Sequence, residues 1–258
     1  MRAQIAITRN GITKATTGTA PPDGGAMARR INGDFQVSLH RRVSNIALVN
    51  LMRALRAIEP GFLMSLRVDT DLQQGLNRAE LCLQLALRTL GNMERENESL
   101  FMSNLEFIRP PTLDLLNSEN LSRLATLELR GMDAPSALMK VSAAGIRHLV
   151  SVGQNRSMRL YFLALPEEVY WPTELPEIGV PLDEAMSSVP CQWLTVLYEM
   201  AMAVQEPIYH HGYIRIGHAG MRPFKRIIYP ITPQNDKPSN FPALSTAEIP
   251  ENDEMIII

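Results

Sequence analysis

Residues 207–232 constrain the fold of this chain more than any other stretch, because they have the pattern of two β-strands around a tight turn. Apolar and β-branched residues flank Gly217-His218-Ala219-Gly220, as expected for a hairpin. A helix is predicted immediately before it over residues 192–204, where apolar side chains recur at helical spacing: Trp193, Val196, Leu197, Met200 and Val204. A helix leading directly into a hairpin predicts a small mixed domain with both α and β structure.

Length and composition indicate an ordinary soluble protein. With 258 residues the chain can bury one good core, or one core and a helical appendage. The hydrophobic and charged fractions, 45% and 20%, are typical of globular domains. Cys82 and Cys191 lie far apart and match no metal or redox spacing, which favours a reducing compartment. Polar residues interrupt the apolar ones after Arg2, which argues against a signal peptide, and no stretch approaches the roughly 20 apolar residues needed to cross a bilayer. We therefore expect a cytoplasmic protein.

Charge is distributed unevenly along the chain. Residues 1–67 carry ten basic and three acidic side chains, whereas the remaining residues carry 15 basic and 24 acidic ones. Such asymmetry can mark contact with nucleic acid or an anionic membrane. A solvated N-terminal arm explains the same charges more simply, so we expect neither a nucleic acid nor a membrane as partner.

The first part of the chain divides into an arm and a helical segment. Glycine, proline and threonine dominate residues 10–26, so residues 1–41 are predicted to be a mostly disordered basic arm. Residues 42–108 are predicted to be helical, with helices over 42–58, from Asp69 or Thr70 to Leu90, and over 94–108. These amphipathic helices could pair within the chain or with a second copy, and a homodimer is one expected outcome.

The second part is predicted to be an α+β domain over residues 109–232. Two short helices are predicted, near residues 118–127 and from the N-cap Asp133 to Gly145. A hairpin follows over residues 146–165, and residues 166–181 form a proline-rich loop. Residues 233–258 are predicted to be a mostly irregular tail. Its apolar end, residues 255–258, is a possible final strand that pairs with a sheet edge.

No residue pattern indicates an enzyme or a metal site. His210 and His211 are adjacent on a strand and point to opposite faces, so they cannot ligate one ion together. No carboxylate or cysteine completes a metal site, and phosphate-binding loops and nucleophile elbows are missing. Half-buried sheet histidines are the simplest interpretation. His148 or His210 facing inward, as a hydrogen-bond partner or haem ligand, is the alternative.

Several short motifs carry a family resemblance. Leu149-Val150-Ser151-Val152 and Arg159-Leu160-Tyr161-Phe162-Leu163 have the pattern of two paired strands. Ile178-Gly179-Val180-Pro181-Leu182-Asp183-Glu184 follows the pattern G-x-x-L-x-E/D. Glu206-Pro207-Ile208-Tyr209 joins the long helix to the next strand. Arg226-Ile227-Ile228-Tyr229-Pro230-Ile231 ends in apolar-Pro-apolar, and Arg109-Pro110-Pro111-Thr112-Leu113-Asp114 precedes the domain.

Together these motifs, over roughly residues 105–232, resemble a bacterial single-domain subgroup of the PAS family. The resemblance implies a sensory domain with a twisted antiparallel sheet and helices on one face. It also implies a fifth strand soon after Thr232, where a proline-rich stretch stands instead, so only residues 255–258 are left to supply it. The cysteine motif of flavin-binding light sensors is absent and no histidine lies on a recognisable haem-binding helix, so the cofactor is undetermined.

The sequence therefore predicts a cytoplasmic α+β protein that is not an enzyme and has a PAS-like domain for signal transduction. We expect it to bind a small ligand or a protein partner in a cup between residues 192–204 and the sheet, with dimerisation through the preceding helices. The alternative is a protein-interaction or structural adaptor with a filled core and no ligand. The residues predicted to line the cup are Tyr161, Trp193, Leu197, Ile214 and Ile228.

Overall fold

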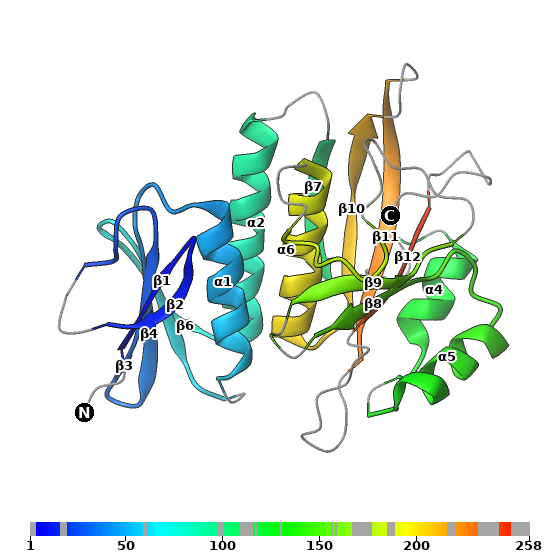
Figure 1. Ribbon diagram of the computed structural model, residues 1–258, viewed down its shortest axis with the longest axis horizontal. Helices are drawn as coiled ribbons and strands as arrows, with labels where there is room; N and C mark the ends of the chain where they lie inside the picture. Colours follow the sequence, from blue (N-terminus) through cyan, green and yellow to red (C-terminus); the bar gives the residue numbers. More distant parts are fainter. Residues whose placement is uncertain are drawn as a thin grey trace. The chain divides into compact units, whose positions relative to one another are not determined.

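The computed structural model of this chain describes residues 4–15, 20–58, 61–96, 101–108, 116, 118–129, 131–155, 157, 159–166, 177–184, 189–215, 220–231 and 243–248. The chain divides into two compact units, Met1–Asn92 (unit 1) and Met93–Ile258 (unit 2), each with a six-stranded sheet of its own (Figure 1). Both sheets are largely antiparallel and helices accompany them, which agrees with the predicted α+β class.

The sheet of unit 1 has the strand order β2-β1-β3-β4-β5-β6. Its strands are β1 (Gln4–Thr8), β2 (Gly11–Lys14), β3 (Ala26–Ile31), β4 (Asp34–Leu39), β5 (Met64–Val68) and β6 (Asp71–Leu76). Asn32 and Gly33, both with positive φ, make the tight turn between β3 and β4. Only β4 and β5 run parallel among these pairs, because α1 (Asn45–Arg56) crosses over between them.

Two helices of the N-terminal part begin at side-chain caps. The Ala47 N–H donates to Ser44 Oγ at the start of α1, which confirms the helix predicted over residues 42–58. α2 (Arg78–Glu96) begins at a reciprocal pair: the Glu80 N–H donates to Asn77 Oδ1, and the Asn77 N–H donates to Glu80 Oε2, each over 2.9 Å. The predicted start of this helix at Asp69 or Thr70 was wrong, because the residues that follow form β6.

The predicted disordered arm over residues 1–41 is replaced by β1 to β4. Ile5 and Ile7 pair with Ala28 and Ala26 in the sheet, and Ile7 is fully buried. Pro21, Pro22, Gly24 and Gly25 lie in the connection between β2 and β3, and Gly11 begins β2. The helical segment predicted over residues 42–108 also needs correction, since it contains β5, β6 and β7 (Phe101–Phe107) between and after its two helices.

Unit 2 contains an antiparallel sheet in the order β7-β10-β11-β12-β8-β9. Its other strands are β8 (Val150–Gln154), β9 (Leu160–Ala164), β10 (Ile208–Arg215), β11 (Met221–Pro230) and β12 (Ala243–Glu248). The two predicted hairpins are present as β8–β9 and β10–β11. The turn predicted at residues 217–220 lies mostly outside the described residues.

Helices cover both faces of this sheet, which corrects the expectation of helices on one face. α6 (Val189–Val204) packs on β9, β11 and β12, and α4 (Glu119–Thr126) packs on β11 and β12. Along β11, Ile227 and Tyr229 belong to the core under α4, whereas Arg226, one residue before Ile227, faces Trp193 of α6 on the opposite side of the strand. Because both sides of the strand are buried, both need a covering helix.

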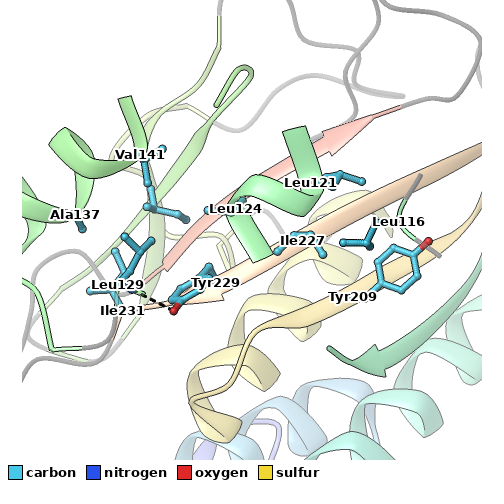
Figure 2. Packing of buried hydrophobic residues seen from close by; sticks show 11 residues of the cluster. Leu116, Leu121, Leu124, Leu129, Ala137, Val141, Tyr209, Ile227, Tyr229 and Ile231 are labelled. Carbon is cyan, nitrogen blue, oxygen red and sulfur yellow. Dashed lines mark hydrogen bonds between the residues drawn. The ribbon is translucent and has the colours of Figure 1, made fainter. Parts of the chain in front are cut away.

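The core under α4 also includes α5 (Ala134–Ala143). Figure 2 shows Leu121 and Leu124 of α4 over Ile227, with Val141 of α5 nearby. The Leu129 N–H donates to the Tyr229 hydroxyl over 3.2 Å, which satisfies a buried backbone donor (Figure 2). Ser118 caps α4 and Asp133 caps α5, which confirms both predicted short helices.

The strand that closes the sheet beside β11 is β12, in a stretch predicted to be irregular. Ser245 pairs with Ile228 of β11 and with Val150 of β8. Ala-Leu-Ser-Thr-Ala is small and almost wholly buried, so it fits between two strands and two helix layers without an alternating pattern. The possible strand at residues 255–258 lies outside the described residues.

Candidate functional site

The layer between α6 and the sheet of unit 2 contains a group of aromatic and polar side chains around Trp193. The Trp193 ring stacks on Phe101 of β7, with centroids 4.9 Å apart. It meets His210 of β10 and Phe224 of β11 edge to face, at 4.8 and 5.3 Å. We call Phe101, Trp193, His210, Phe224 and Arg226 the Trp193 cage. Residues from four elements meet in it.

The register of three neighbouring strands explains why these side chains meet. His210 lies opposite Arg226 of β11 and opposite Leu105 of β7, so all three project from the same face of the sheet. Phe224 lies two residues before Arg226 and shares that face. Trp193 lies near the start of α6 and reaches the face from above. The cage is therefore a product of strand pairing and cannot form from any one segment alone.

His210 is the least satisfied polar side chain of the cage. It is 0% exposed, and neither Nδ1 nor Nε2 has a hydrogen-bond partner among the described residues. Burial lowers the pKa of His210 well below its ordinary value of 6.5, and the nearby charges of Arg226 and His211 lower it further. The imidazole is therefore neutral at pH 7, with one N–H donor and one acceptor nitrogen enclosed by rings.

Arg226 contributes a cation to the same layer. Its guanidinium carbon lies 5.3 Å from the centroid of the Trp193 ring, in the geometry of a cation–π contact. The side chain is fully buried, and burial lowers the pKa of Arg226 to about 10, while the Tyr198 hydroxyl raises it in part. Arg226 is still protonated at neutral pH. The cage thus disfavours any further positive charge.

A buried hydroxyl pair extends the polar strip toward β12. Tyr198 of α6 and Ser245 of β12 share a hydrogen bond of 2.6 Å, and the Tyr198 ring meets Phe162 of β9 edge to face at 6.4 Å. Burial raises the pKa of Tyr198, against the opposing influence of Arg226 and the bond to Ser245. The hydroxyl is therefore a neutral donor or acceptor.

The cage connects to the end of α2 through Ser103 of β7. Trp193 Nε1 donates to Ser103 Oγ over 3.4 Å. The Ser103 hydroxyl and backbone N–H both donate to Glu94 Oε1, over 3.2 and 2.6 Å. Gly212 lies opposite Ser103, and a Cβ there would stand 2.8 Å from Ser103 Cα and closer still to the Met102 carbonyl oxygen. Glycine is therefore required for this close approach of β7 and β10.

The opposite face of β10 carries a different polar cluster. His211 Nε2 and Glu106 Oε1 share a hydrogen bond of 2.9 Å, and the Tyr209 ring stacks on the imidazole at 4.7 Å. Burial, with a contribution from the Glu106 charge, raises the pKa of Tyr209 to about 12. The prediction that His210 and His211 point to opposite faces is confirmed, since His210 lies in the cage.

Four of the five residues predicted to line a cup share the face of the sheet that α6 covers. Trp193, Leu197 and Ile228 are fully buried and Ile214 is 2% exposed. Ile214 pairs with Phe101, and Leu197 follows Trp193 by one helical turn. These four residues therefore lie in one buried layer between α6 and the sheet.

Tyr161, the fifth predicted residue, lies on the other face. Phe162 of β9 contacts Tyr198 of α6, so its neighbour Tyr161 points away from α6. Its ring packs over Gly153 of β8, where a Cβ would stand 2.7 Å from the ring. Tyr161 is therefore not brought together with the other four residues.

Sequence reasoning missed Phe101, Phe224 and Arg226, and it placed His210 inward only as an alternative. Phe101 fell in a segment predicted to be helical. The signal for the others was alternation: His210 is two residues from Ile208, and Arg226 is two residues from both Phe224 and Ile228. Arginine is rarely buried, so the alternating pattern alone does not indicate that Arg226 faces the core.

Other features of the described residues define no further site. No group of three or more His, Cys, Asp or Glu side chains in the described ranges could hold a metal ion. Cys82 and Cys191 are buried and form no disulfide among the described residues, and burial raises the pKa of Cys82 to about 12. Among the helices that the structure describes, none has the length and apolar character needed to cross a membrane.

Comparison with known proteins identifies no family for this chain. No family model matches it, no curated protein matches it, and no solved structure matches it. The fold and the Trp193 cage therefore carry the functional argument by themselves.

Proposed function

We propose that this chain is a non-enzymatic sensory or regulatory protein whose unit 2 is PAS-like, and that the Trp193 cage is where a small ligand binds. The observation that carries the proposal is that both ring nitrogens of the fully buried His210 have no hydrogen-bond partner in the part of the chain that the structure describes. Nearly all buried polar groups in folded proteins have a hydrogen-bond partner. A ligand that accepts from one nitrogen and donates to the other would supply both.

The order of elements in unit 2 supports the PAS-like part of the proposal. β8, β9, α6, β10, β11 and β12 follow one another as the resemblance implies, and β12 supplies a fifth strand beside the fourth. Glu206 and Pro207 lead into β10, and the run from Arg226 to Pro230 ends β11, at the positions of the quoted motifs. Three elements are additions to the PAS-like order: β7 at one edge of the sheet, and α4 and α5 on its second face.

The chemistry of the cage limits the kind of ligand. The neutral imidazole offers one donor and one acceptor, and the rings of Trp193 and Phe224 favour a flat apolar body. Arg226, directly opposite His210 across the strands, disfavours a cation. We therefore expect a neutral or anionic planar molecule. Its binding would shift the population between two packings of α6 on the sheet.

A thermal-shift screen tests the proposal. Wild type and His210→Phe are heated with a library of neutral and anionic aromatic metabolites, and His148→Asn provides a matched histidine control. We expect at least one compound to raise the Tm of wild type and of His148→Asn while leaving His210→Phe unchanged. A library that stabilises no variant, or that stabilises His210→Phe equally, contradicts a ligand site at His210.

A second function, a protein-interaction adaptor with a filled core, is favoured by the burial of the same layer. Trp193, Leu197 and Ile228 have no exposed surface, so the layer between α6 and the sheet is packed. In an adaptor, His210→Phe would keep the full set of partners while no small molecule bound. Pull-down of one defined partner by both variants, with no compound active in the screen, would select this reading.

Pairing of two copies through the N-terminal helices remains part of the proposal. α1 packs on β1, β2 and β3 of its own sheet, so a dimer would need other helical surface, such as Leu87 of α2, which is 37% exposed. Light scattering of the purified chain, compared with Leu87→Lys, measures this directly. A mass of one copy at high concentration removes dimerisation from the proposal.

A further inference from the structure

A chain of hydrogen bonds links the Trp193 cage to the last turn of α2. Trp193 Nε1 donates to Ser103 Oγ, Ser103 Oγ donates to Glu94 Oε1, and the Ser103 N–H donates to the same carboxylate oxygen. These three residues lie on three elements of unit 2. α2 begins in unit 1 at Arg78, and its final residues, from Met93 to Glu96, belong to unit 2.

Ser103 is the middle residue of this series of hydrogen bonds, because it bonds to both Trp193 and Glu94. Its hydroxyl accepts from the indole and donates to the carboxylate. Its backbone N–H lies on β7, which is an edge strand, and donates to Glu94 rather than to another strand. Hydrogen bonds to a carboxylate are stronger than neutral ones, so the Glu94 end is held firmly.

The bond at the cage end is the weaker one. Its length of 3.4 Å is at the long limit for a hydrogen bond, so a small displacement of the indole breaks it. The indole is packed against His210 at 4.8 Å and Phe101 at 4.9 Å. Any change that moves the His210 ring therefore acts on the Trp193 N–H within the same contact layer.

We infer that Ser103 is a coupling residue, which passes a change at His210 to the C-terminal turn of α2 through Trp193 and Glu94. With the indole bond made, the Ser103 hydroxyl is fixed and gives Glu94 its second hydrogen bond. With the indole bond broken, the hydroxyl can rotate, and Glu94 keeps only the backbone N–H. The last turn of α2 is then less firmly attached to β7. That a bound ligand causes the change at His210 rests on the proposed function, whereas the coupling between His210 and the end of α2 does not.

Amide hydrogen exchange of the full chain, without any ligand, tests the coupling. The measured quantity is the exchange rate over residues 91–96 at the end of α2. His210→Phe supplies the change at the cage, because it replaces an imidazole by a larger ring against Trp193. We expect a several-fold change in exchange over residues 91–96 in His210→Phe, and no such response when Ser103→Ala is already present.

Two further variants keep the test decisive. Ser103→Thr retains the hydroxyl and should keep the response, which protects the result if Ser103→Ala is poorly folded. Asn104→Ala removes a neighbouring side chain on β7, whose amide oxygen accepts from the Leu105 N–H, and should also keep the response. The inference is overturned if His210→Phe changes exchange over residues 91–96 just as much when Ser103→Ala is present. It is also overturned if His210→Phe alone causes no change. Because no ligand is used, a failed ligand screen leaves this result unaffected.

Discussion

Acidification should destabilise unit 2 through His210. The imidazole is fully buried and its pKa in the folded chain is well below 6.5, because of burial first and the charge of Arg226 second. The unfolded chain takes up a proton as the pH falls below about 6.5, whereas folded His210 does not. The unfolded state therefore binds more protons in this range. Stability is complete above about pH 6.5 and is lost as the pH falls toward the folded pKa.

The size of this loss follows from the unfolded-state pKa alone. As long as folded His210 stays neutral, one extra proton binds to the unfolded chain, and the free energy of unfolding falls by ~1.4 kcal/mol between about pH 7.5 and about pH 5.5. The two charged groups that act on the ring, Arg226 and His211, both disfavour its protonation in the folded chain. Arg226 is positive, and Tyr198 on α6 is hydrogen-bonded as a neutral hydroxyl. Glu199 lies six residues after Trp193, about 240° around α6, on another side of the helix.

Urea unfolding followed by Trp193 fluorescence measures the effect. Trp171→Phe makes Trp193 the sole tryptophan of the chain. Wild type in this background should lose about 1.4 kcal/mol between the two pH values beyond the loss shown by His210→Phe. His148→Asn is the matched control and should retain the wild-type loss, since asparagine tolerates the φ of 57° at that position. Equal pH dependence of wild type and His210→Phe would refute the reasoning.

Three further outcomes follow from contacts described above. Gly212→Ala should lower the free energy of unfolding by about 2 kcal/mol or more, because the new Cβ collides with the Met102 carbonyl, as a urea titration would show. Tyr198→Phe should cost about 1–3 kcal/mol by leaving Ser245 unpaired in the core, and adding Ser245→Ala should recover part of that loss. Cys82, whose pKa burial raises to about 12, should react with a thiol reagent at neutral pH only in denaturant, and rapid labelling of the native chain would contradict its burial.

Elements with strong local signals were predictable. Ser118 and Asp133 start α4 and α5 because each side chain accepts a backbone N–H three residues on, a signal written in the sequence itself. The hairpins β8–β9 and β10–β11 were visible as apolar stretches on either side of polar or glycine-containing turns. In these cases the sequence near each element determines its conformation.

Elements whose conformation depends on distant partners were missed. Phe101 and Leu105 are four residues apart, a spacing that suits a helix and equally a strand, and only pairing with β10 decides for the strand. β1 and β3 are short strands that pair with each other, and a segment rich in glycine and proline separates them in the sequence. β12 is buried on both faces, so it shows no alternation that could reveal it.

The candidate site was predictable only in part, for the same reason. Trp193, Leu197, Ile214 and Ile228 follow helix or strand periodicity, and they do share one layer. The polar members of the cage depend on cross-strand register. His210 and Arg226 lie opposite each other only because β10 and β11 pair in one register, which sets which side of each strand faces α6.

The measurement that most directly tests the Trp193 cage as a ligand site is the native mass and absorbance spectrum of the purified chain, with His210→Phe beside it. The ligand proposal predicts a bound small molecule on wild type, seen as added mass or as absorbance beyond that of the protein, and its loss in His210→Phe. A wild-type mass equal to that of the 258 residues alone, or an added mass that His210→Phe retains, would contradict it.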